Sequence, residues 1–186
     1  KKMFEFLFNW FWQIFYNLGL FEKNASILLL GLDNAGKTTL MYLLKDNRIV
    51  QYAPTQRAAQ EQISIGQLKL TAYDVGGHQA VRTIWKDYFT ETDAIVFVID
   101  SADESRFEEM KTELHELLSD EILRSIPFLI LCNKMDLKKS KSKEHISNIL
   151  NIFEFKKQGK EIGIFACSMH KKNGVKEAFE WLSNKL

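Results

Sequence analysis

The sequence has few cysteines, almost no net charge and no long uninterrupted apolar run, and each shortage excludes a class of protein. The two cysteines, Cys132 and Cys167, are far apart, which excludes a disulfide scaffold or a zinc module and fits a reducing compartment. Lys and Arg number 25 against 24 Asp and Glu, so no nucleic-acid partner is expected. Apolar residues at 46% and charged residues at 26% exclude a disordered chain and a polytopic membrane protein.

The chain of 186 residues is long enough for one domain with a full hydrophobic core. After Asn24, short apolar runs alternate with longer amphipathic stretches, which predicts an α/β fold with a mostly parallel six-stranded sheet and helices on both faces. Strands are expected at residues 26–30, 63–65, 68–73, 94–99, 128–131 and 163–167, and helices at 37–44, near 81–88, and at 105–118, 143–150 and 175–186. The alternating runs on either side of Gly66 predict one antiparallel hairpin.

The aromatic residues are unevenly distributed, because nine of the 23 fall within the first 21 residues. Within residues 3–20 the polar members recur at every fourth position, namely at Glu5, Asn9, Gln13 and Asn17. On a helix these four side chains form one stripe about 120° wide, and the rest of the surface is apolar. Residues 1–21 therefore predict an N-terminal amphipathic helix, and residues 22–186 a separate globular domain.

Several roles compete for this N-terminal helix. A transmembrane helix needs ~20 predominantly apolar residues, and a polar residue at every turn argues against one. A secretory signal peptide needs a small-residue cleavage site, which residues 17–20 do not offer. An interfacial helix at the level of the lipid headgroups is favoured over a core helix packed on the domain, because so wide an apolar face would otherwise leave a large exposed patch. The interfacial helix and the core helix are both possible if the helix docks on the domain in one state and is released in another.

A phosphate-binding loop follows the first expected strand. In GLDNAGKT, Gly31, Gly36, Lys37 and Thr38 match the pattern G-x-x-x-x-G-K-[ST]. Glycines let backbone N–H groups turn toward phosphate oxygens, and the following helix adds its positive N-terminal end. Lys37 would reach the β- and γ-phosphates, and the Thr38 hydroxyl would ligate Mg²⁺. Nucleotide binding is therefore assigned to Asp33, Asn34, Ala35, Gly36, Lys37, Thr38 and Thr39.

Two further motifs follow in the order that a GTPase requires. Asp74 ends the run 70–73 and precedes two glycines, so its carboxylate would hold a water on Mg²⁺ while a backbone N–H approaches the γ-phosphate. Residues 133–136 read Asn-Lys-Met-Asp at the end of an expected strand. There, Asp136 would accept two N–H bonds from guanine that adenine does not offer, which selects GTP over ATP. The base would contact Asn133, Lys134 and Asp136, with Ser168 and Met169 closing over it.

The motifs resemble those of a small GTPase of the Arf-related branch, and the resemblance covers essentially the whole chain. They are GLDNAGKTTL, YDVGGH, WKDYF, NKMD and CSM. Within that branch, the aromatic N-terminal segment and the His after the Gly-Gly pair resemble the Sar-type (secretion-associated, Ras-related) GTPases, which start COPII coat assembly at the endoplasmic reticulum. The resemblance implies a P-loop NTPase fold with one antiparallel interswitch hairpin. It also implies GTP or GDP and Mg²⁺ as cofactors.

The resemblance further implies individual roles. Thr55 would be the switch threonine that ligates Mg²⁺ when GTP is bound, although residues 56–60 depart from the family's pattern. Gly77 would sense the γ-phosphate, and the catalytic residues would be His78, which orients the attacking water, and Lys37, which neutralises developing charge. The hairpin around Gly66 would slide with the nucleotide state and displace the N-terminal helix.

The implied partners are membrane lipids through residues 3–20, the inner COPII coat subunits including the GTPase activator, and an exchange factor in the endoplasmic reticulum membrane. The implied location is cytoplasmic, peripheral on that membrane and on vesicles derived from it. No internal arginine finger is evident, because Arg57 and Arg82 are better interpreted as surface residues, so hydrolysis without an activator is expected to be slow. The alternatives are an Arf-like membrane adaptor or membrane-remodelling protein with vestigial hydrolysis, and a P-loop kinase or ATPase.

The first residues bear on how the membrane would be bound. The chain begins Lys1-Lys2-Met3, so Met3 is either the native start behind an added pair or part of a fragment. If Met3 is the start, Phe4 occupies the position at which Arf proteins usually carry a myristoylated glycine. Membrane binding would then come from the apolar face of the helix rather than from an acyl chain.

Overall fold

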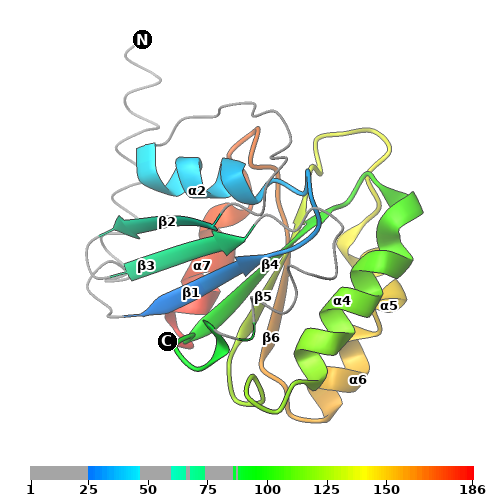
Figure 1. Cartoon of the computed structure of the whole chain (residues 1–186). Helices are drawn as coiled ribbons and strands as arrows, with labels where there is room; N and C mark the ends of the chain where they lie inside the picture. The colour runs from blue at the N-terminus through cyan, green and yellow to red at the C-terminus, as the bar shows by residue number, and fades with distance from the viewer. Residues whose placement is uncertain (1–24, 47–59, 66–67, 74–85, 87) are drawn as a thin grey trace.

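The computed structural model describes residues 25–46, 60–65, 68–73, 86 and 88–186, and these contain one six-stranded sheet with the order β2-β3-β1-β4-β5-β6. The strands are β1 (Ser26–Leu30), β2 (Gln60–Ile65), β3 (Leu68–Tyr73), β4 (Ala94–Asp100), β5 (Phe128–Asn133) and β6 (Ile162–Ala166). All neighbours pair in parallel except β2 and β3, which are antiparallel (Figure 1). The expected mostly parallel sheet and its single antiparallel pair are confirmed.

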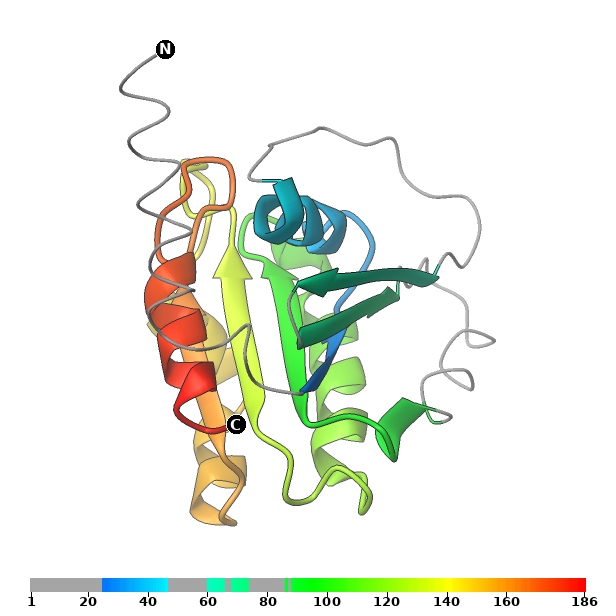
Figure 2. The ribbon, with the colours of Figure 1, turned by 90° about the vertical axis from the view of Figure 1, so that its left-hand side faces the viewer.

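Helices cover both faces of the sheet. They are α2 (Lys37–Asp46), the 3₁₀ turn η2 (Glu104–Arg106), α4 (Phe107–Ser119), α5 (Lys143–Ile149), α6 (Ile152–Lys157) and α7 (Val175–Ser183). Buried side chains of α2 and α7 belong to one core cluster, and those of α4, α5 and α6 belong to a second cluster on the opposite face. The layers can be followed in Figure 1 and Figure 2.

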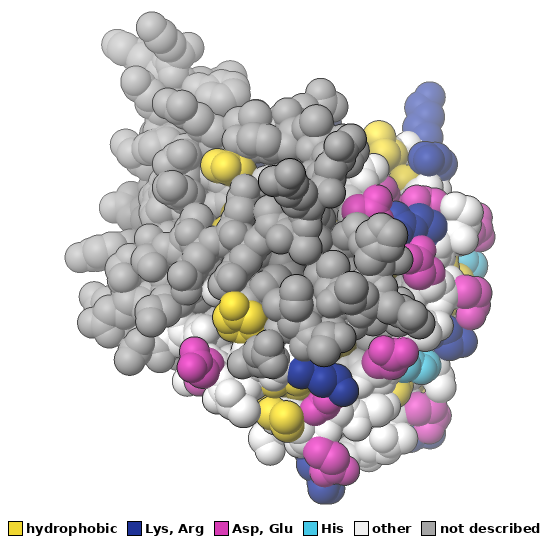
Figure 3. Space-filling view, in the orientation of Figure 1, with side chains coloured by type: hydrophobic (Ala, Val, Ile, Leu, Met, Phe, Trp, Pro, Cys, Tyr) yellow, Lys and Arg dark blue, Asp and Glu magenta, His cyan; other side chains and the backbone are white. Residues whose placement is uncertain are grey.

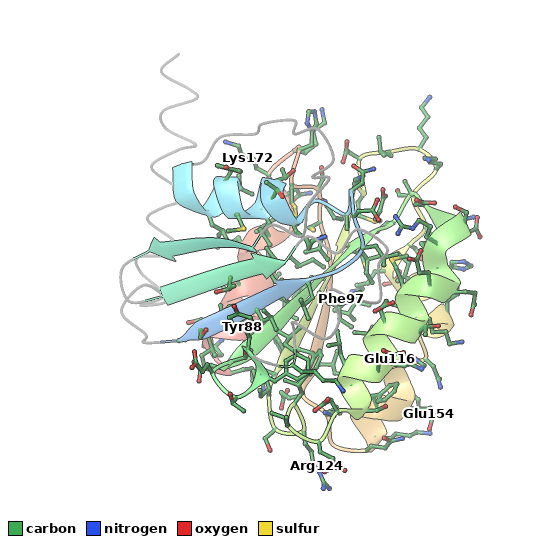
Figure 4. All side chains as sticks on the ribbon, viewed as in Figure 1. Tyr88, Phe97, Glu116, Arg124, Glu154 and Lys172 are labelled. Carbon is green, nitrogen blue, oxygen red and sulfur yellow. The ribbon has the colours of Figure 1, made fainter. Side chains whose placement is uncertain are left out.

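The central strands are buried on both faces because successive side chains alternate between the two clusters. In β1, Ile27 and Leu29 pack with α2 and α7, whereas Leu28 and Leu30 pack with the other helices. All of residues 94–99 in β4 are fully buried, and Phe97 lies at the centre of the molecule (Figure 4). This packing holds the carboxyl ends of β1, β4 and β5 at one edge of the sheet, where ligands bind in open α/β folds.

Some boundaries differ from those expected. β5 continues through Asn133 instead of ending at 131, because Asp100 and Asn133 remain paired in the parallel register. α6 was not predicted; it is short and is separated from α5 by Asn151, whose φ of 51° interrupts the right-handed helix. The N-terminal helix, the division at residue 21, the hairpin turn at Gly66 and most of the helix expected near 81–88 lie outside the described residues.

The surface of the α4 and α5 side carries acidic and basic side chains interspersed (Figure 3), as the net charge of +1 leads one to expect. Among the described residues, no helix has the length and apolar character needed to cross a membrane.

Candidate nucleotide site

The loop between β1 and α2 is a tight cradle that only glycine permits at two positions. Gly31 and Gly36 have φ values of +131° and +109°, a region that favours glycine. A Cβ atom on Gly31 would lie 2.2 Å from the Val98 carbonyl oxygen, and one on Gly36 would lie 2.4 Å from Nδ2 of Asn133. The backbone therefore turns closely against β4 and β5, and the loop ends at the N-terminus of α2, where N–H groups are available to an anion.

Lys37 places a buried cation inside this loop. Its side chain is only 3% exposed, and Nζ donates to the carbonyl oxygens of Gly31 at 2.8 Å and Leu32 at 2.7 Å. These two hydrogen bonds offset the cost of burying the ammonium group. Thr38 follows on the first turn of α2 and is partly buried, and its hydroxyl is of the oxygen type that Mg²⁺ prefers. The cradle and its cation fit a nucleotide phosphate chain with Mg²⁺.

Asn133 joins the phosphate loop to the loop that follows β6. The side chain is 4% exposed; Nδ2 donates to the Ala35 carbonyl oxygen at 2.8 Å, and Oδ1 accepts from the Met169 backbone N–H at 3.1 Å. Both ends of the amide are thus bonded to loops distant in sequence. That Asn133 contacts the base stays a prediction; the geometry shows that its side chain braces two loops against β5.

Asp136 is an exposed carboxylate whose orientation is fixed by Ser168. The Ser168 hydroxyl donates to Oδ1 of Asp136 at 2.6 Å and accepts from the Lys171 backbone N–H at 3.0 Å. The hydrogen bond from Ser168 lowers the pKa of Asp136, and the nearby charge of Lys171 acts in the same direction. The carboxylate is therefore ionised near neutral pH, as an acceptor for two N–H groups must be.

The Lys134 side chain is held by an ion pair where strands β4 and β5 end. Its φ of 64° is left-handed, and its Nζ lies 2.7 Å from Oδ2 of Asp100, with both side chains mostly buried. Oδ1 of Asp100 in turn accepts from the backbone N–H of Ala102 at 2.9 Å. This ion pair anchors the lysine at the carboxyl end of β4, next to the predicted base-binding loop.

Neither cysteine is placed for chemistry. Burial raises the pKa of Cys132 to about 12 and raises that of Cys167 as well, so both remain protonated thiols. Their side chains belong to opposite core clusters. In the described part of the chain, no group of three or more His, Cys, Asp or Glu side chains is arranged to hold a metal ion.

The described members of the predicted site all lie at the carboxyl edge of the sheet. The phosphate-loop residues 33–39 and the base-site residues Asn133, Lys134, Asp136, Ser168 and Met169 are brought together by the contacts above. Thr55, Asp74, Gly77 and His78 lie outside the described residues and stay predictions. The sequence prediction missed two residues that contact this set: Asp100, the partner of Lys134, and Arg106, whose Nη2 lies 2.7 Å from Oδ1 of Asp33. The only local signal in the sequence was the acidic residue Asp100 at the end of an expected strand, and no such signal pointed to Arg106.

A phosphate-loop motif with a buried lysine, next to a loop that holds an oriented carboxylate, on a mostly parallel sheet of this order, is typical of a P-loop GTPase. The model of the ADP-ribosylation factor family matches residues 11–186. The chain belongs to the ADP-ribosylation factor family of small GTPases, whose members hydrolyse GTP.

Individual relatives agree with this assignment. The chain is 40% identical to the small COPII coat GTPase SAR1 of Nicotiana tabacum, over 96% of this chain and 98% of the relative. It is 37% identical to the small COPII coat GTPase SAR1 of Giardia intestinalis, over the same shares. It is 37% identical to ADP-ribosylation factor K of Dictyostelium discoideum, over 100% of this chain and 97% of the relative. The resemblance to the Sar-type GTPases is confirmed.

Proposed function

We propose that this small GTPase is a membrane switch that, in the GTP-bound state, inserts residues 3–20 into the endoplasmic reticulum membrane and recruits the COPII coat for transport to the Golgi. The observation that carries the proposal is a GTPase domain preceded by a segment with one polar stripe and nine aromatic residues. Two relatives of nearly the same length are small COPII coat GTPases by name. The partners would be membrane lipids, an exchange factor in that membrane, and inner coat subunits that include the activator.

Hydrolysis would proceed by in-line attack of water on the γ-phosphate. Lys37, buried and already bonded to two loop carbonyls, would neutralise charge that develops on the phosphates. His78 would orient the attacking water, and the backbone N–H of Gly77 would contact the γ-phosphate. Mg²⁺ would be held by Thr38, Thr55 and Asp74, and when bound it supplies further charge neutralisation. Hydrolysis is expected to be slow until an activator contributes an arginine.

A test of membrane insertion can use the full chain. On a helix, Phe11 lies about 180° from the centre of the polar stripe, whereas Gln13 lies within it, so Phe11→Glu and Gln13→Glu add the same charge to opposite faces. Wild type and Gln13→Glu are expected to float with liposomes when loaded with a non-hydrolysable GTP analogue and not with GDP. Phe11→Glu is expected to stay unbound. Flotation that ignores the nucleotide, or that survives Phe11→Glu, contradicts the proposal.

The second candidate, an adaptor whose hydrolysis is vestigial, is favoured by the departure of residues 56–60 from the family's pattern. His78→Gly distinguishes the two. A switch that needs catalysis only to reset loses activator-stimulated hydrolysis and keeps GTP-dependent recruitment to liposomes. An adaptor with vestigial hydrolysis shows the same low turnover in wild type and in the variant.

A further inference from the structure

An ion pair ties the phosphate loop to the start of α4. Nη2 of Arg106, the residue that precedes α4, lies 2.7 Å from Oδ1 of Asp33. The same guanidinium donates from Nε to Oε2 of Glu109 at 2.8 Å and from Nη2 to Oε1 of Glu109 at 3.3 Å. The Arg106 and Asp33 side chains are 27% and 39% exposed, so this pair is screened less than one on the open surface. Two carboxylates therefore fix one planar guanidinium.

Asp33 is an acidic residue in a loop that binds phosphates. It directly follows Leu32, whose carbonyl oxygen accepts from Nζ of Lys37, so its carboxylate belongs to the same loop as the predicted phosphate-binding cation. A carboxylate without a counter-charge in that place repels a bound nucleotide. The repulsion is greater for GTP than for GDP, because the γ-phosphate adds negative charge to the ligand.

We propose that Arg106 is a positioning residue for the nucleotide switch: by pairing with Asp33 it holds the loop carboxylate on the α4 side and offsets its charge, which favours GTP relative to GDP. Arg106 acts through Asp33 and not by contact with the nucleotide. Glu109 orients the guanidinium from its other side. The proposal concerns the nucleotide site alone, so its test in solution is independent of membrane insertion and of the coat.

The test is a double-mutant comparison on the full chain, with a non-hydrolysable GTP analogue and GDP as the two probes. Arg106→Ala is expected to lower the ratio of analogue affinity to GDP affinity about tenfold, the effect of one partly screened charge. In Arg106→Ala/Asp33→Asn, which also lacks the carboxylate, the ratio is expected to return to within about threefold of wild type. Glu109→Gln keeps the Arg106–Asp33 pair and is the matched control, with an expected change of about twofold or less.

Rescue by Asp33→Asn is the readout that a purely structural role would not produce. If Arg106→Ala weakens both nucleotides equally, or if the double variant keeps the low ratio, the proposal is wrong. Arg106→Lys provides a second route if Arg106→Ala does not fold. Lysine keeps the charge but not the planar fork, so the ratio is expected to fall about threefold. An unchanged ratio in the lysine variant together with an unchanged ratio in Arg106→Gln also overturns the proposal.

Discussion

The two edges of the sheet differ in how their polar side chains are held. At the carboxyl edge, Lys37, Asn133 and Ser168 are each 5% exposed or less, and each bonds to a neighbouring loop or to its own. At the opposite edge, a cavity of about 630 Å³ is lined mostly by polar residues, among them the exposed Glu121 and Arg124. Figure 4 shows Lys172 and Arg124 at these two ends of the molecule.

This difference indicates that the carboxyl edge is the edge at which the fold builds a site. Buried polar side chains are costly unless every partner is present, so they persist where a defined geometry is needed. Three of the four described left-handed residues other than glycine also lie at the carboxyl edge, at Asn34, Lys134 and Lys172, and the fourth, Asn151, lies between α5 and α6. Backbone strain of this kind clusters at functional sites. At the opposite edge, which holds the amino ends of the parallel strands, the connecting loops are solvated.

The largest contrast is expected from matched carboxylates at the two edges. Asp136→Asn replaces one of the two carboxylate oxygens proposed to accept from guanine with an amide N–H donor, and it is expected to weaken GTP and GDP binding about a thousandfold. Asp120→Asn alters a carboxylate that accepts from the Ile122 backbone N–H at 2.9 Å, far from the site, and nucleotide affinity is expected to stay unchanged. Nucleotide displacement titration measures both. Equal effects of the two variants would show that the carboxyl edge is not the base site.

Two left-handed glycines provide the next comparison. In Gly36→Ala the new Cβ meets Nδ2 of Asn133 at 2.4 Å, whereas in Gly159→Ala it meets nothing within 4 Å, and the φ values are +109° and +87°. Gly159→Ala is expected to cost about 1 kcal/mol of stability from backbone strain alone. Gly36→Ala is expected to add a loss of about a hundredfold in nucleotide affinity. Urea unfolding and nucleotide titration separate the effects, and undiminished affinity in Gly36→Ala would rule out a tight cradle.

Removal of the brace between the loops should affect stability. Asn133→Ala leaves the Ala35 carbonyl and the Met169 N–H without their side-chain partner and is expected to cost about 3 kcal/mol in urea unfolding. Gln158→Ala changes an exposed side chain at the amino edge and is expected to cost about 0.5 kcal/mol or less. Comparable losses from the two would mean that Asn133 contributes no more than a surface residue.

The smallest effect concerns the pKa of Asp136. The Ser168 hydrogen bond stabilises the ionised carboxylate, so Ser168→Ala is expected to raise that pKa toward the ordinary value of about 3.9. The ionised Asp136 carboxylate stabilises the folded state at pH values above the pKa of the group in the unfolded chain. This stabilisation is lost as the pH falls through the pKa of the group in the folded protein. NMR titration of the Asp136 carboxyl carbon measures the shift. Ser140→Ala, which alters a hydroxyl bonded to the Leu137 carbonyl, is the control, and equal midpoints in both variants would refute the role of Ser168.

Contiguous features could be predicted from the sequence, and contacts between distant segments could not. The β1–loop–α2 unit follows from one motif and one apolar run, and β1 and β3 have the expected bounds. The brace from Asn133 to Ala35 spans 98 residues and depends on the register of β5 against β4. The Arg106–Asp33 pair depends on where η2 ends. α6 was missed because six residues are too few for a clear helical period.

The Asn133 side chain also fixes a spacing. It ties the phosphate loop and the loop of Met169 to one strand, so the two half-sites for a nucleotide stand at a constant separation. A ligand that carries both a base and a phosphate chain is then bivalent, and once one end binds, the other end is held at a high effective concentration. A nucleoside or a pyrophosphate alone lacks that advantage. Loosening either half-site is therefore expected to weaken binding of the whole nucleotide.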